Sequence, residues 1–156
     1  MLYSSKSVAE TNKIAADFLP KIIGSLTNDQ SGVAGATVVG LFGDLGSGKT
    51  TFTQSLGKHL GIKEVMTSPT FVIEKIYLLK NHSEEFPVAF TRLIHIDAYR
   101  LEKGEELQSL GFAELLKDPK NLILIEWPER VVDILPPKMV KINFKFVSEF
   151  EREIEF

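Results

Sequence analysis

The chain has 156 residues, of which 44% are hydrophobic and 25% are charged, a composition typical of folded globular proteins. This length predicts a single domain over residues 1–156. The formal net charge of −3 gives no overall positive field for direct binding to nucleic acid. Zero cysteines exclude disulfides, cysteine zinc sites, iron–sulfur clusters and thiolate catalysis.

The sequence also carries no pattern that directs it to a membrane. No stretch reaches the roughly 20 apolar residues that a membrane-spanning helix needs. Residues 1–12 lack the apolar core of a signal peptide. We therefore expect a cytoplasmic protein that has no contact with a membrane.

The first third of the chain predicts a helix, a strand and a second helix. Residues 7–10 match an S-x-x-E capping box, and apolar residues recur at helical spacing over residues 8–26. Pro20 is expected to end or kink this helix. A polar connector is expected over residues 27–35. The apolar run at residues 37–42 predicts a buried strand, and residues 49–60 predict a helix that a glycine caps.

The middle of the chain predicts further strands and short helices. Residues 70–79 and 88–96 are rich in β-branched and aromatic side chains, which predicts an antiparallel pair around a polar loop that contains Asn81, Ser83 and Pro87. Short helical pieces are expected on either side of Gly111. The continuously apolar residues 122–125 predict another buried strand.

The last part of the chain predicts a short helix and a closing hairpin. Pro128 favours the start of the helix. Apolar residues alternate over residues 139–147 and again to Phe156 after a turn near Ser148. Together the elements predict an α/β, three-layer fold like that of P-loop NTPases, with a mixed and partly antiparallel central sheet.

The segment after the first predicted strand matches the phosphate-loop pattern G-x-x-x-x-G-K-[ST] at every fixed position. Backbone N–H groups of such a loop and the N-terminus of the next helix surround phosphate oxygens. Lys49 would neutralise the β- and γ-phosphates, and Thr50 rather than Thr51 would ligate Mg²⁺. ATP and Mg²⁺ are therefore expected ligands of Gly43, Asp44, Leu45, Gly46, Ser47, Gly48, Lys49, Thr50 and Thr51.

Two carboxylates and one hydroxyl are candidates for the remaining chemistry. Asp97 and Glu126 each end an apolar strand and could face the phosphate loop, so one could ligate the metal while the other orients or deprotonates water. The sequence does not rank them, and ordinary solvation at a strand end is the alternative for each. Thr70, in the segment Ser68-Pro69-Thr70-Phe71, could sense the γ-phosphate or could be a turn residue only.

Four further residues near these acids have both a functional and a structural interpretation. Arg100 and Arg130 could stabilise phosphate charge or form structural ion pairs. Trp127 could lie near the nucleotide, face a partner or pack in the core. His95 points to the same strand face as Asp97, as a structural residue or a member of the site.

Four motifs that follow one another along the chain resemble those of the TsaE family, the bacterial ATPases of tRNA threonylcarbamoyladenosine biosynthesis. The resemblance covers the chain from the first helix to Arg130, whereas the closing hairpin is not diagnostic. The motifs are Gly43-Asp44-Leu45-Gly46-Ser47-Gly48-Lys49-Thr50-Thr51, Ser68-Pro69-Thr70-Phe71, His95-Ile96-Asp97-Ala98-Tyr99-Arg100-Leu101 and Glu126-Trp127-Pro128-Glu129-Arg130.

This resemblance implies a small cytoplasmic ATPase that works with the proteins TsaD and TsaB. These partners attach threonylcarbamoyl to adenosine 37 of tRNAs that read ANN codons, and hydrolysis of ATP would reset their complex. The tRNA would be contacted only indirectly, through that complex.

The resemblance also implies roles for single residues. Thr50 and Glu126 would be Mg²⁺ ligands, Lys49 the phosphate contact, Asp97 an acid needed for hydrolysis and Thr70 a switch residue. An N-terminal S-x-x-x-T element formed by Ser7 and Thr11 would bring Thr11 near the adenine, although the residues alone assign Ser7 only a helix cap.

Three other functions compete with this one. A small-molecule kinase would need a mobile lid, but only Arg100 and three lysines lie between the two candidate acids. A regulatory GTPase is disfavoured because no N-K-x-D follows the phosphate loop and residues 97–100 are not D-x-x-G. The third alternative is a binding module in which ATP stabilises a partner-binding shape without obligatory hydrolysis.

Overall fold

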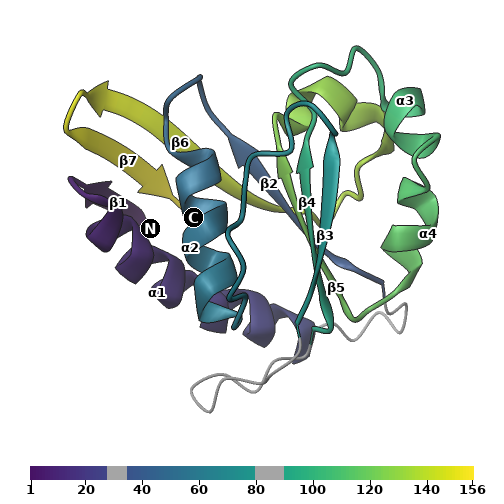
Figure 1. Ribbon diagram of the computed structural model, residues 1–156, viewed down its shortest axis with the longest axis horizontal. Helices are drawn as coiled ribbons and strands as arrows, with labels where there is room; N and C mark the ends of the chain where they lie inside the picture. The colour runs from purple at the N-terminus through teal and green to yellow at the C-terminus, as the bar shows by residue number, and fades with distance from the viewer. Residues whose placement is uncertain (28–34, 80–89) are drawn as a thin grey trace.

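The centre of the molecule is a mixed β-sheet. In this computed structural model, which describes residues 1–27, 35–79 and 90–156, the sheet has seven strands in the order β1-β7-β6-β2-β5-β4-β3 (Figure 1). The strands are β1 (Leu2–Ser5), β2 (Thr37–Phe42), β3 (Glu74–Leu78), β4 (Arg92–Asp97), β5 (Asn121–Glu126), β6 (Val140–Ser148) and β7 (Glu151–Glu155). Strands β4, β5, β2 and β6 are parallel, whereas β3, β7 and β1 pair antiparallel with their neighbours. The predicted mixed sheet is confirmed.

Helices cover both faces of this sheet and make the expected three layers (Figure 1). One face carries α1 (Val8–Thr27) and α2 (Lys49–His59). The other carries α3 (Gly104–Gln108), α4 (Phe112–Lys117) and the 3₁₀-helix η1 (Pro128–Ile134). The central strands are buried on both faces, which explains why they are continuously apolar rather than alternating.

Helix α1 contains Pro20, where the sequence predicts an end or a kink. The helix does not end there but continues to Thr27. Pro20 is exposed, whereas Phe18, Leu19 and Ile22 on the opposite face are buried in the core. Packing of that apolar face outweighs the backbone hydrogen bond that proline removes. The predicted cap is present, because the Ser7 hydroxyl accepts a hydrogen bond of 3.1 Å from the Glu10 N–H.

The two ends of the chain meet in the sheet. Strand β1, which the sequence did not predict, pairs antiparallel with β7 so that Tyr3 lies opposite Ile154. The predicted closing hairpin is confirmed, and Phe144 of β6 lies opposite the same Ile154. The hairpin extends the sheet beyond β2 toward the side covered by α1 (Figure 1).

Some predicted segments lie outside the described residues. They are most of the polar connector over residues 27–35, the loop that contains Asn81, Ser83 and Pro87, and the start of the strand expected from Val88. The described part of that strand pairs antiparallel with β3, as predicted. Within the described ranges, no helix combines the length and the apolar character that crossing a bilayer requires.

Candidate functional site

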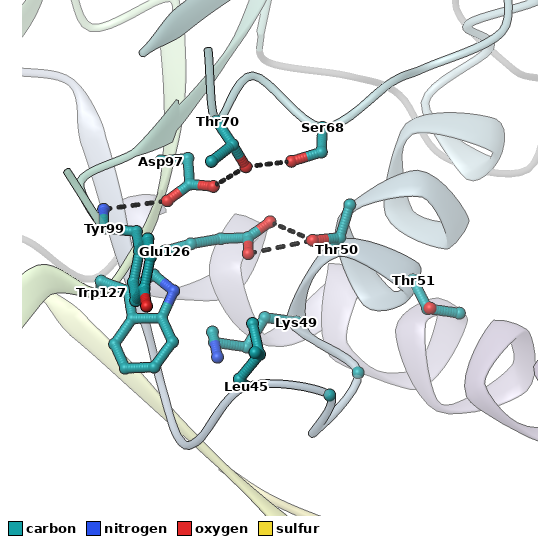
Figure 2. A pocket seen from close by; sticks show the side chains of 12 residues that line it. Leu45, Lys49, Thr50, Thr51, Ser68, Thr70, Asp97, Tyr99, Glu126 and Trp127 are labelled. Carbon is teal, nitrogen blue, oxygen red and sulfur yellow. Dashed lines mark hydrogen bonds between the residues drawn. The ribbon is translucent and has the colours of Figure 1, made fainter.

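A pocket of about 320 Å³ lies where the carboxyl ends of β2, β4 and β5 meet the N-terminus of α2 (Figure 2). This edge of a parallel sheet is where α/β proteins commonly bind ligands. The predicted site residues that line the pocket are Leu45, Gly46, Gly48, Lys49, Thr50, Thr51, Thr70, Asp97 and Glu126. The lining also includes Ser68, Tyr99 and Trp127, whereas Gly43, Asp44 and Ser47 belong to the same loop without lining the pocket.

The phosphate loop, residues 43–50, turns the chain from β2 into α2. Gly43 and Gly46 have φ angles of +138° and +77°, which side chains rarely tolerate. The loop is also held from outside, because Arg152 of β7 donates a 2.9 Å hydrogen bond from Nε to the Gly46 carbonyl. The strand–loop–helix order that the sequence predicted is therefore present.

We expect the two glycines to differ sharply when each is replaced by alanine. A Cβ atom on Gly43 would lie 2.2 Å from the Phe144 carbonyl oxygen, whereas one on Gly46 would meet nothing within 4 Å. Gly46→Ala should cost about 1 kcal/mol of unfolding free energy from its left-handed backbone alone. Gly43→Ala adds a backbone clash and should cost more than about 3 kcal/mol. Urea denaturation measures both, and equal losses would contradict this account of the loop.

Lys49 is the first residue of α2, and its side chain reaches back to the start of the phosphate loop. Its Nζ donates to the carbonyls of Gly43 at 2.6 Å and Asp44 at 2.9 Å. The same atom lies 4.1 Å from the centre of the Trp127 ring. Burial lowers the pKa of Lys49 from its ordinary value, and nearby carboxylates, above all Glu126, oppose this effect. A buried cation at this position would be stabilised by an incoming phosphate.

The two candidate acids lie side by side, because Asp97 and Glu126 are register partners in β4 and β5. Glu126 faces the phosphate loop: the Thr50 hydroxyl donates to its Oε1 at 2.8 Å and its Oε2 at 3.0 Å (Figure 2). Its Oε1 also lies 2.8 Å from Nε2 of the fully buried His95. Thr51 points away from this group (Figure 2).

Asp97 is held by a different set of donors. The Thr70 hydroxyl donates to its Oδ2 at 2.5 Å, and the Tyr99 backbone N–H donates to its Oδ1 at 2.9 Å. Ser68 extends the chain of contacts, with its hydroxyl 2.7 Å from that of Thr70 (Figure 2). The two carboxylates therefore have separate surroundings, one tied to the phosphate loop and one to the segment around Thr70.

The segment around Thr70 is a turn and not the start of a strand. The prediction of a strand from residue 70 is wrong, since β3 begins at Glu74. The Pro69 carbonyl accepts hydrogen bonds from the N–H groups of Val72 and Ile73, and Ile73 adopts a φ of +68°. The Ile73 carbonyl then accepts from the Asp97 N–H at 2.9 Å. This strained turn brings Thr70 to Asp97.

Aromatic side chains form one wall of the site. Trp127 has a left-handed backbone, with φ of 58°, and its indole lines the pocket 5.0 Å from the Tyr99 ring. Arg130 lies over the Tyr99 ring at 5.9 Å, and Arg100 lies over the exposed Phe71 ring at 4.4 Å. Tyr99 was not among the predicted site residues, although its position two residues after Asp97 at a strand end was a usable signal.

Thr11 is placed apart from these residues. It lies in the first turns of α1, where its buried hydroxyl is 2.8 Å from that of Ser5. It does not line the pocket. Its predicted contact with adenine stays a prediction.

The oxygen atoms around Thr50 suit a magnesium ion whose other ligands would come from a bound phosphate and water. The Thr50 hydroxyl and the Glu126 carboxylate are hard oxygen donors, which Mg²⁺ prefers. Among the described residues, no group of three or more His, Cys, Asp or Glu side chains could hold a metal on its own. Mg²⁺ commonly uses one or two carboxylates together with water and substrate phosphates, so these residues fit it.

Comparisons with known proteins show which family the chain belongs to. A family model described as threonylcarbamoyl adenosine biosynthesis protein TsaE matches residues 5–154. The tRNA threonylcarbamoyladenosine biosynthesis protein TsaE of Bacillus subtilis is 37% identical over 119 residues, which cover 76% of this chain and 68% of that protein. The protein of the same name from Rickettsia typhi is 38% identical over 116 residues, 74% of this chain and 73% of that one.

A solved structure shows the same architecture. The crystal structure of Bacillus subtilis YdiB matches with a TM-score of 0.66 and 28% sequence identity, over 99% of this chain and 82% of that chain. The family model spans nearly all of the chain, and its match agrees with the four motifs found in the sequence. The chain belongs to the TsaE family.

Proposed function

We propose that this chain is a cytoplasmic, Mg²⁺-dependent ATPase that forms a single domain. It would act together with the proteins TsaD and TsaB. In the formation of threonylcarbamoyladenosine at position 37 of ANN-decoding tRNAs, its hydrolysis of ATP would reset their complex. Membership of the TsaE family supports the role in tRNA threonylcarbamoyladenosine biosynthesis. The observation that carries the ATPase activity is the convergence of Lys49, Thr50, Asp97 and Glu126 on one pocket.

Each of these residues has a distinct task in the proposal. Lys49 and the N–H groups of the phosphate loop bind the phosphates, and Thr50 and Glu126 hold the metal. Mg²⁺, when bound, supplies positive charge to the phosphate oxygens. Asp97 is the second carboxylate of the pocket, and its Oδ2 can orient a water or accept its proton when the Thr70 hydroxyl turns away. A turn of the Thr70 hydroxyl would in this way couple the presence of nucleotide at Asp97 to the conformation of residues 68–71.

Binding of ATP should change the fluorescence of the protein. The chain has a single tryptophan, Trp127, and the Lys49 ammonium lies 4.1 Å from its ring centre. A phosphate that draws this ammonium away would change the field at the indole. We expect a saturable change in emission on titration with ATP and a much smaller one with adenosine. Equal responses to the two compounds would show that phosphate is not what the loop detects.

The proposed function is tested by ATP hydrolysis with purified protein, alone and with TsaD and TsaB. We expect hydrolysis that needs Mg²⁺, rises when both partners are present, and falls to background in Lys49→Ala. Binding of ATP without hydrolysis in either mixture would favour a binding module. Transfer of the γ-phosphate to a metabolite would favour a small-molecule kinase.

A further inference from the structure

His95 is a polar side chain with buried leucines beside it on its face of the sheet. It lies on β4 with 0% exposure, and its register partner on β5 is the buried Leu124. Leu93 and Leu124 on the same sheet face belong to the core that α1 and α2 cover. An imidazole costs free energy in such a place unless its polar atoms are bonded. His95 therefore needs a hydrogen-bond partner inside the protein.

That partner is Glu126, which lies two residues after Leu124 on β5. The distance from His95 Nε2 to Glu126 Oε1 is 2.8 Å, and an ionised carboxylate can only accept, so Nε2 donates. Nδ1 is buried and has no hydrogen-bond partner among the described residues. A proton on Nδ1 would be a buried, unsatisfied donor, so the geometry places the bonding proton on Nε2.

The contact restricts how the Glu126 side chain can turn. Oε1 accepts from both Thr50 and His95 at 2.8 Å, while Oε2 accepts from Thr50 at 3.0 Å. Thr50 lies in the first turn of α2, and its hydroxyl would turn to the metal in the proposed site, whereas His95 belongs to a buried strand. Of the contacts described for the Glu126 carboxylate, the bond from His95 is therefore the one that does not depend on the Thr50 hydroxyl.

We propose that His95 is a positioning residue that holds the Glu126 carboxylate toward the phosphate loop, ready for the metal. This rests on the proposed Mg²⁺-dependent ATPase function. Partners that orient a metal-binding carboxylate change metal affinity or activity by about 10–100-fold when they are removed. A purely structural histidine would affect stability but not the response to Mg²⁺.

Three substitutions separate these two roles. His95→Gln can place an amide N–H near the position of Nε2, whereas His95→Asn is too short and His95→Leu has no donor. The measurement is the Mg²⁺ concentration that half-saturates ATP binding, together with ATP binding in EDTA. His95→Leu and His95→Asn should raise that concentration about tenfold. His95→Gln should stay within about threefold of the parent, and binding in EDTA should change less than about twofold in all three variants.

The matched control is His59→Leu, which removes another imidazole from the same side of the sheet. Its ring contacts the Asn12 carbonyl and lies outside the pocket, so its Mg²⁺ response should match the parent. Equal shifts for His95→Leu and His95→Gln, or a loss in EDTA as large as the loss with Mg²⁺, would overturn the positioning role.

A second readout needs neither nucleotide nor metal. Nitrogen-15 NMR of the His95 ring, assigned by its loss in His95→Gln, should show the proton on Nε2. Glu126→Leu should shift that signal. A proton on Nδ1, or an unchanged signal, would overturn the contact. A parent protein whose ATP binding ignores Mg²⁺ would instead overturn the proposed function, while the ring spectrum still decides whether His95 holds Glu126.

Discussion

Lys49→Ala is expected to weaken ATP binding by about a hundredfold, because a charge-assisted hydrogen bond to phosphate contributes about 1.5–3 kcal/mol. The Lys49 ammonium is bonded to the carbonyls of Gly43 and Asp44, and burial lowers the pKa of this group. The cation is therefore only partly compensated before phosphate binds. Removing it should leave the free energy of unfolding nearly unchanged, since the desolvation cost of the ammonium disappears together with its contacts.

Isothermal titration of ATP, combined with urea denaturation, checks both halves of this expectation. Lys58→Ala is the matched control, because Lys58 lies on the exposed side of the same helix α2. That variant should bind ATP like the parent. A similar loss of affinity in the two variants would mean that the general charge of the helix, and not the Lys49 ammonium, attracts the phosphates.

The part of the fold that carries the phosphate loop was predictable from the sequence. The loop needs glycine where φ is positive, a lysine and a threonine at set spacings, and a strand and a helix on either side. All of these constraints are local, so Gly43 to Thr50 and the flanking runs contain them. The apolar strands that end at Asp97 and Glu126 were predictable for the same reason, and parallel pairing then brought their ends together.

The elements that were missed depend on partners far away in the chain. Strand β1 has only four residues and exists because β7 pairs with it, a contact that no local pattern reveals. Pro20 is tolerated because the buried face of α1 holds the helix on both sides of it. The turn at residues 70–73 contains β-branched residues that favour a strand, but contacts with Asp97 determine its shape.

The sequence also could not rank the two acids, because strand periodicity places both carboxylates at the same edge of the sheet. Only the folded structure shows that their hydrogen-bond donors differ. Glu126 accepts from the Thr50 hydroxyl and the His95 ring, whereas Asp97 accepts from the Thr70 hydroxyl and the Tyr99 N–H. These contacts favour Glu126 as the proposed metal ligand. In the proposed mechanism, Asp97 would then act on the attacking water.

Glu126→Gln is therefore expected to lower Mg²⁺-dependent hydrolysis by at least about a hundredfold, because an amide is a much weaker magnesium ligand than a carboxylate. The fold should survive, since the amide oxygen can still accept the hydrogen bonds from Thr50 and His95. Binding of ATP in EDTA should be retained or slightly stronger, because one negative charge near the phosphates is gone.

The control for this variant is Glu129→Gln. It removes an exposed carboxylate that, like Glu126, acts electrostatically on Lys49. Steady-state hydrolysis over a range of Mg²⁺ concentrations compares both variants with Asp97→Asn. Glu126→Gln should shift the dependence on Mg²⁺, whereas Asp97→Asn should lower the maximal rate at an unchanged Mg²⁺ requirement. The reverse pattern would exchange the two roles, so that Asp97 would hold the metal and Glu126 would act on the water.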